Sequence, residues 1–197
     1  MSEAHELAER AEHFIGDNRR IALLISVLAL FLALSETLGK SAQTAAISDN
    51  VQASDLWAFY QAKTIRQTVL RTASESLALT GTNNEATKAA IKQEVDEWQK
   101  AIDRYEVDPV KPEGRKQLSE RATVLEHSRD TALAKYHNYE IASAAFQIGI
   151  VLASATVITG MTLLLFLSAG IGVLGILFTT FGLFAPELLH LALLGAH

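Results

Sequence analysis

Charge is almost absent from the last part of the chain, and this constrains the fold more than any other feature. Residues 141–197 contain a single charged side chain, Glu187, and the uncharged run IALLISVLALFLALS precedes Glu36 near the N-terminus. Most of the Lys, Arg, Asp and Glu residues lie between positions 40 and 140. Soluble globular domains spread charge over their whole surface, so this segregation excludes that class and predicts an integral membrane protein.

Three apolar segments are candidates for membrane crossing. Residues 21–38 would extend roughly 27 Å as a helix, close to the ~30 Å hydrocarbon core of a bilayer. Residues 141–167 and 171–194 are predicted as the second and third crossings, with a turn at 168–170 between them. Residues 1–20 are predicted to form an N-terminal polar, amphipathic helix before the first crossing.

The middle of the chain, residues 39–140, is predicted as an extramembrane helical stalk. One heptad seam begins at Leu118 and continues without a phase break to Leu164, which predicts a single helix of about 45 residues or more. Thr82 and Glu85 match a capping box at the start of the preceding helix. That helix carries its own heptad seam: Ile91, Val95, Trp98, Ile102 and Tyr105.

The fold class that follows is an all-α membrane protein. Three transmembrane helices are expected, with a long helical hairpin or coiled-coil stalk between the first and the second. Arg19 and Arg20 adjoin the first crossing. By the positive-inside tendency they favour a cytoplasmic N-terminus and a periplasmic stalk, in a multi-pass protein of a bacterial inner membrane.

Composition argues against several classes of function. The net charge is −5 and the basic residues alternate with acidic ones, so nucleic-acid binding is not expected. The absence of Cys excludes disulfides, thiolate zinc sites and cysteine nucleophiles. No phosphate-binding loop or catalytic triad pattern is present, so we predict no enzymatic activity, no catalytic residues and no cofactor.

Three ionisable residues lie in or beside the apolar segments. Glu36 is late in the first, and Glu187 and His190 are late in the third, so all three are expected at a similar depth on the stalk side. A charge in hydrocarbon costs about 2.5–3.5 kcal/mol, so such groups face protein or water. They either form an acidic, cation-binding ring at a pore mouth or are solvated among lipid headgroups. Glu187 and His190 also have a di-iron spacing, but without a second copy no metal site is predicted.

Small residues form a stripe along each apolar segment. Such stripes allow helices to pack closely in a membrane, and in the first segment the stripe is alternatively the lining of a central pore. Aromatic residues farther out, in the stalk, are expected to contact the returning helix, a neighbouring copy or a partner protein. The stripe of the first segment comprises Ala22, Ser26, Ala29, Ala33 and Thr37, and the stalk aromatic residues are Trp57, Tyr60 and Trp98.

Two stretches of the sequence resemble a known family. Leu34-Ser35-Glu36-Thr37 and the segment NVQASDLWAFYQAK, from Asn50 to Lys63, are similar to the bacterial membrane proteins grouped as the domain of unknown function 4337 family. The resemblance implies a helical membrane protein and supplies no activity. It also implies that Glu36 and the Trp57 region belong to the recognisable part of the family.

These features lead to two functional hypotheses. The first is a homo-oligomeric, cation-channel-like or ion-pathway protein with an acidic ring at Glu36. The second is a non-conducting membrane scaffold whose helical stalk binds a protein partner. The expected partners are therefore the lipid bilayer, further copies of the chain and, under the first hypothesis, cations.

Overall fold

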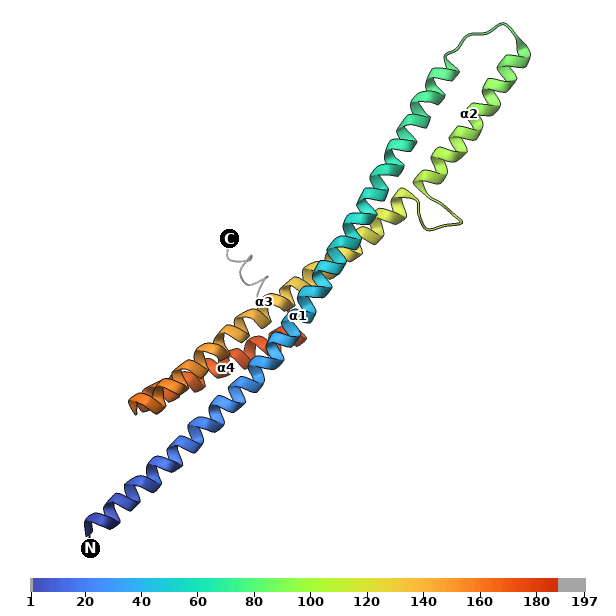
Figure 1. Cartoon of the computed structure of the whole chain (residues 1–197). Coiled ribbons are helices and arrows are strands. Elements are labelled where there is room, and N and C mark those ends of the chain that lie inside the picture. Colours follow the sequence, from blue (N-terminus) through green and yellow to red (C-terminus); the bar gives the residue numbers. More distant parts are fainter. Residues whose placement is uncertain (1, 188–197) are drawn as a thin grey trace. The chain divides into compact units, whose positions relative to one another are not determined.

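The structure is a computed structural model that describes the backbone of residues 2–187 and the side chains of residues 19–187. These residues form four α-helices and no strand, which confirms the all-helical prediction (Figure 1). The helices are α1 (Ser2–Ala78), α2 (Glu85–Glu106), α3 (Arg115–Thr159) and α4 (Thr162–Phe184). Residues 2–20 are helical and belong to α1, which begins at Ser2 and continues into the first apolar segment without a break near residue 20.

The chain divides into two compact units. Unit 1 comprises Met1–Ala46 and Asp130–His197, and unit 2 comprises Ile47–Arg129. In unit 1, α4 doubles back along α3 (Figure 1), and the side chain of Ser168 on α4 donates a hydrogen bond to the carbonyl of Gly149 on α3. In unit 2, α2 runs back along α1, where Gln67 donates to the carbonyl of Ile102.

Three of the described helices are long and apolar enough to cross a membrane. They are the part of α1 from Arg19 to Ala78, α3 and α4. In their most apolar windows only 17%, 28% and 17% of the residues are buried inside the protein. Most of these apolar side chains therefore point outward, which is the reverse of the arrangement in a soluble helical bundle.

The long helix α3 confirms the unbroken heptad prediction. It spans 45 residues, and its buried face follows the predicted seam as far as Ala153. Val157 is exposed, and the helix ends at Thr159, before Leu164. The seam is tightly packed in both units, because the exposed fraction of Leu118 is 1% and that of Phe146 is 0%. The seam prediction for α2 is confirmed too, since Ile102 is buried and its other seam residues are half-buried.

The turn between α3 and α4 lies at Gly160–Met161, so the prediction of a turn at 168–170 is wrong. Gly160 has φ 68°, a left-handed conformation that suits glycine, and its N–H donates to the carbonyl of Thr156. The expected crossings 141–167 and 171–194 are corrected accordingly: α3 ends at Thr159, and α4 starts at Thr162 and ends at Phe184. The small residues near position 170 lie within α4 and do not end the helix.

The start of α2 also differs from its prediction. Asn84 is the N-cap, and its side chain accepts hydrogen bonds from the backbone N–H groups of Ala86 and Thr87. Thr82 accepts from the N–H of Asn84, so it does not form a capping box with Glu85. Asn is at least as good an N-cap as Thr, which explains why the helix begins at the later position.

The loop between α2 and α3 is organised by Asp108. One oxygen of its carboxylate accepts hydrogen bonds from the backbone N–H groups of Lys111 and Val110, both at 2.9 Å. These bonds favour the ionised form and lower the pKa of Asp108 below its ordinary value of 3.8.

Asp108 is therefore expected to make the stability of the chain depend on acid pH. Because its folded pKa lies below its unfolded pKa, its contribution is complete above pH 3.8 and is lost as the pH falls through the folded pKa. The Asp108→Asn variant keeps an acceptor but has no charge to titrate. Its unfolding temperature should fall less than that of the native chain between pH about 5 and pH about 2. Parallel curves for the two proteins would contradict this role for Asp108.

Candidate functional site

Unit 1 packs α1, α3 and α4 around a small apolar core. Its buried members are Leu28, Ala142 and Phe146. Glycines on α4 allow close contact, because a Cβ at Gly172 would lie 2.7 Å from the Leu28 side chain and a Cβ at Gly175 would lie 2.7 Å from the Phe146 ring. The small-residue stripe of α4 is therefore used for packing within one copy of the chain.

Polar side chains also join the helices of this unit. The hydroxyls of Ser35 on α1 and Thr179 on α4 lie 3.0 Å apart, and Ser35 is fully buried. Nearer the start of α4, the hydroxyl of Ser168 donates to the carbonyl of Gly149 at 2.7 Å. Hydrogen bonds of this kind fix the rotation of each helix about its axis, and so determine which side chains of α1 face outward.

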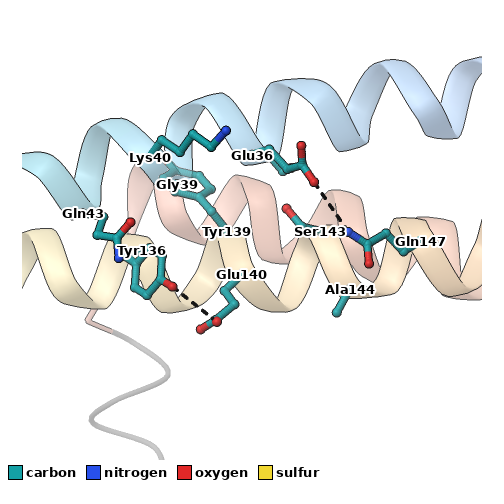
Figure 2. Close-up of a pocket in the computed structure, with 11 residues that line it drawn as sticks. Glu36, Gly39, Lys40, Gln43, Tyr136, Tyr139, Glu140, Ser143, Ala144 and Gln147 are labelled. Atoms are coloured by element: carbon teal, nitrogen blue, oxygen red, sulfur yellow. Dashed lines mark hydrogen bonds between the residues drawn. The ribbon is translucent and has the colours of Figure 1, made fainter.

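A polar groove lies between α1 and α3, next to these contacts (Figure 2). Its volume is about 350 Å³, and every residue lining it comes from one of the two helices. Two carboxylates, one amine, two amides and two phenols contribute to the lining, although the neighbouring faces of both helices are apolar. The polar residues are Ser35, Glu36, Lys40, Gln43, Tyr136, Tyr139, Glu140, Ser143 and Gln147.

Glu36 is the predicted site residue that the groove contains. Its side chain is exposed, and one carboxylate oxygen lies 3.5 Å from the amide nitrogen of Gln147, at the outer limit of a hydrogen bond (Figure 2). Glu140 is engaged more fully, since it accepts from the Tyr136 hydroxyl at 3.3 Å and lies 3.7 Å from His137. Among the described residues, Glu36 has no ion-pair partner, so its carboxylate keeps most of its capacity to bind a cation or water.

The small-residue stripe of α1 lies on the exposed side of the helix. Ala22, Ser26, Ala29, Ala33 and Thr37 are all exposed in the single chain, whereas the corresponding stripe of α4 is buried. The two hydroxyls of the stripe donate to carbonyls of their own helix, one turn earlier. The stripe is therefore free to contact lipid, water or another copy without leaving a polar group unsatisfied.

The structure does not bring Glu187 close to Glu36. Glu187 accepts a hydrogen bond from Thr131 at 3.0 Å, while Glu36 lies beside Gln147. Thr131 and Gln147 are 16 residues apart on α3, which corresponds to roughly 24 Å along the helix axis. The expectation of a common depth is therefore wrong for these two carboxylates, and His190 lies outside the described residues.

The stalk aromatic residues pack within unit 2. The indole N–H of Trp57 donates to Glu126 on α3 at 2.9 Å, and the ring lies edge-on to Tyr60 with centroids 5.4 Å apart. The hydroxyl of Tyr60 accepts from Arg115 at 2.8 Å. Trp98 is half-buried on the seam of α2. These contacts correspond to the expectation that the aromatic residues meet the returning helix.

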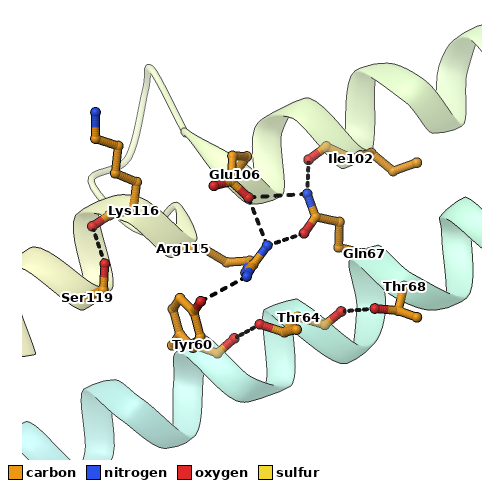
Figure 3. A network of polar contacts seen from close by, with 9 residues as sticks. All are labelled: Tyr60, Thr64, Gln67, Thr68, Ile102, Glu106, Arg115, Lys116 and Ser119. Atoms are coloured by element: carbon orange, nitrogen blue, oxygen red, sulfur yellow. Dashed lines mark hydrogen bonds and ion pairs between the residues drawn. The ribbon is translucent and has the colours of Figure 1, made fainter.

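Arg115 is the centre of a polar network that joins all three helices of unit 2 (Figure 3). Its guanidinium donates to Gln67 on α1, to Glu106 at the end of α2 and to Tyr60 on α1, and it lies over the Tyr60 ring at 4.8 Å. Gln67 also donates to the carbonyl of Ile102 at 3.3 Å. The network fixes the point at which α2 ends and α3 begins.

Sequence reasoning missed this network because the packed seam of α1 is made of small and polar residues. An apolar heptad is easily seen, but here the buried positions have no shared hydrophobic character. Their separations of ten, four and seven residues, which are sums of threes and fours, are the signal that could have identified them. The buried residues of α1 in unit 2 are Ala53, Lys63, Gln67 and Ser74.

Comparison with known families agrees with the resemblance of the segment from Leu34 to Lys63. The family described as domain of unknown function (DUF4337) matches residues 17–185. The chain belongs to this family. No curated protein and no solved structure matches the chain.

The DUF4337 match covers both helices that form the groove, together with the Arg115 network. Glu187 lies two residues beyond the matched range. The family description names no activity, so the chemistry of the groove has to indicate the function. No group of three or more His, Cys, Asp or Glu side chains able to hold a metal ion occurs in the part of the chain that the structure describes.

Proposed function

We propose that this chain is a multi-pass membrane protein whose copies associate and conduct cations along a path that includes Glu36. The observation that carries the proposal is an exposed carboxylate in a polar groove between two helices with apolar outer faces. A charge at such a position is costly against lipid, so it faces water or another protein surface. Carboxylates at a pore mouth concentrate cations and exclude anions.

The depth of Glu36 supports a position at the mouth of the path. Tyr139 packs against Gly39 on α1 and against Gly182 near the end of α4. Glu36 precedes Gly39 by three residues, which places it roughly 4.5 Å farther along α1 toward the middle of α4. If α4 spans the hydrocarbon, Glu36 lies about one turn inside the end of that span, where a carboxylate can still be reached by water.

The exposed stripe of α1 supports association through this helix. The small residues of α4 are already used within one copy, whereas those from Ala22 to Thr37 are not. Close packing of α1 helices around an axis would cover the stripe and bring several Glu36 side chains together. With Arg19 and Arg20 at the other end of the span, we place the N-terminus in the cytoplasm and the stalk in the periplasm of a bacterial inner membrane.

The test is cation flux in vesicles that contain the purified full-length chain. Glu36→Gln is expected to reduce flux about tenfold or more, because the variant keeps the size of the side chain but loses the charge that attracts cations. Glu187→Gln is the matched control and should retain most of the flux, since Glu187 lies beside Thr131. Native flux in Glu36→Gln, or an equal loss in both variants, would contradict the assignment.

A non-conducting scaffold is the second candidate. Exposed apolar side chains on the part of α1 in unit 2 favour it, because the exposed fractions of Ile65 and Val69 are 65% and 60%. In this case the native chain would give no flux above that of empty vesicles. Trp57 and Tyr60 are engaged inside unit 2, so binding of a partner would depend on the exposed residues instead.

A further inference from the structure

Within unit 2, α1 has two seams, of which only one is covered. The packed seam contains Ala53, Lys63, Gln67 and Ser74, which face α2 and α3. A second series of residues recurs at alternating spacings of four and three along the exposed side of the same helix. We call it the outer seam: Ile47, Val51, Ser54, Ala58, Gln61, Ile65, Thr68 and Thr72.

The outer seam lacks the charges of a solvated helix surface. All eight of its residues are exposed and none is charged, and the exposed fractions of Ile47, Val51 and Ile65 are 60%, 53% and 65%. By contrast, the exposed side of α2 carries Lys88, Lys92 and Glu94. A spacing of four and three residues keeps a seam facing one partner helix over many turns.

We propose that the outer seam pairs with the outer seam of a second copy, with the two α1 helices parallel and in register. The direction rests on the proposed function, because copies that share one membrane with the same topology have parallel α1 helices. The pairing then occurs between identical residues. Ile47, Val51 and Ile65 would meet their counterparts and remove apolar surface from water.

The charges beside the outer seam are compatible with this arrangement. Asp55 and Arg71 are the only charged residues at the positions directly flanking it between Ile47 and Thr72. In a parallel, in-register pair, each flanking residue faces one that lies five positions away on the opposite flank of the second helix. Asp55 then faces Asn50 and Arg71 faces Ser76, so no like charges oppose each other along the outer seam between Ile47 and Thr72.

The same register leads back along the sequence into the stripe of the first apolar segment. Continuing from Ile47 with alternating spacings of three and four gives a series of exposed residues: Thr44, Lys40, Thr37, Ala33, Leu30 and Ser26. Three residues of the stripe proposed to face the axis in the membrane, Ser26, Ala33 and Thr37, therefore share one heptad register with the outer seam. Ser54, Gln61 and Thr68 would specify the register, as buried polar residues do in coiled coils.

The absence of Cys from the chain makes the pairing directly testable by cross-linking. Ser54→Cys and Thr68→Cys place a thiol on the outer seam, and Gln52→Cys is the control. Gln52 is exposed on the same helix, but two residues correspond to about 200° of rotation, so it points away from Ser54. Each variant is oxidised as the full-length chain in native membranes.

Disulfides require Cα atoms within about 7 Å, so both seam variants should form about tenfold more cross-linked dimer than Gln52→Cys. An antiparallel pair would link identical residues at only one place along the helix. Cross-linking at Ser54 or Thr68 but not at both would therefore overturn the proposal, and equal cross-linking in the control would overturn it too. Flux is measured separately: cross-linking without flux would retain the seam and refute the ion path, and Glu36-dependent flux without cross-linking would do the reverse.

Discussion

Replacing Gly175 by alanine is expected to destabilise unit 1 by about 1–3 kcal/mol, because it overfills a packed contact. The new Cβ would lie 2.7, 2.8 and 2.9 Å from three atoms of the Phe146 ring. That ring is fully buried and stacks on Phe31 with centroids 5.8 Å apart, so it has little room to move. Thermal unfolding of the detergent-solubilised chain, followed by circular dichroism, would measure the effect.

Gly170→Ala is the matched control in the same helix. A Cβ at Gly170 would meet nothing within 4 Å, so this variant gains helix propensity without a clash. It should be neutral or more stable than the native chain by up to about 1 kcal/mol. The two substitutions are chemically identical and should have opposite effects. If both raised the unfolding temperature, the close approach of α4 to Phe146 would be wrong.

The second large effect is expected at Arg115. Arg115→Met keeps much of the length of the side chain but removes its hydrogen bonds to Gln67, Glu106 and Tyr60. Gln67 is 7% exposed and would lose the donor to its amide oxygen. Hydrogen bonds to a charged group contribute about 1.5–3 kcal/mol, so the unfolding free energy of the stalk should fall by about that amount.

Arg66→Met provides the comparison for this variant. Arg66 is exposed on the same helix as Gln67, so its replacement should change the unfolding free energy by no more than about 0.5 kcal/mol. Urea unfolding of both full-length variants, followed by Trp fluorescence, reports on unit 2, because Trp57 and Trp98 both lie there. Equal midpoints for the two variants would show that the Arg115 network contributes little to stability.

The regular parts of the fold could be predicted from the sequence because their signals are periodic. The seam from Leu118 to Leu164 predicted a continuous helix, and α3 is continuous over 45 residues. The position of its end could not be predicted, because glycines at 160, 170, 172 and 175 are all compatible with a turn. The structure distinguishes three of them: Gly172 and Gly175 lie against Leu28 and Phe146, whereas Gly160 adopts the left-handed conformation of the turn.

The candidate site was predicted less completely than the fold. Glu36 could be identified because it is isolated in an apolar segment, but its neighbours could not. Gln147 is 111 residues away in the sequence, and its contact with Glu36 depends on the rotation of both helices. The expected grouping of Glu36 with Glu187 is wrong for a related reason. The turn between α3 and α4 lies eight residues or more before its predicted position, and this changes which part of α3 faces the end of α4.

The contact between Ser35 and Thr179 has a consequence for the order of events during biosynthesis. The two residues are 144 positions apart in the chain. At about 5–20 residues per second, the ribosome needs roughly 7–30 s after making Ser35 to produce its partner on α4. The helices α3 and α4 are joined by a two-residue turn and can pair as soon as both exist. Until Thr179 is made, the face of α1 around Ser35 lacks its neighbour on α4, so a chaperone or insertase that shields the nascent chain would act on this face.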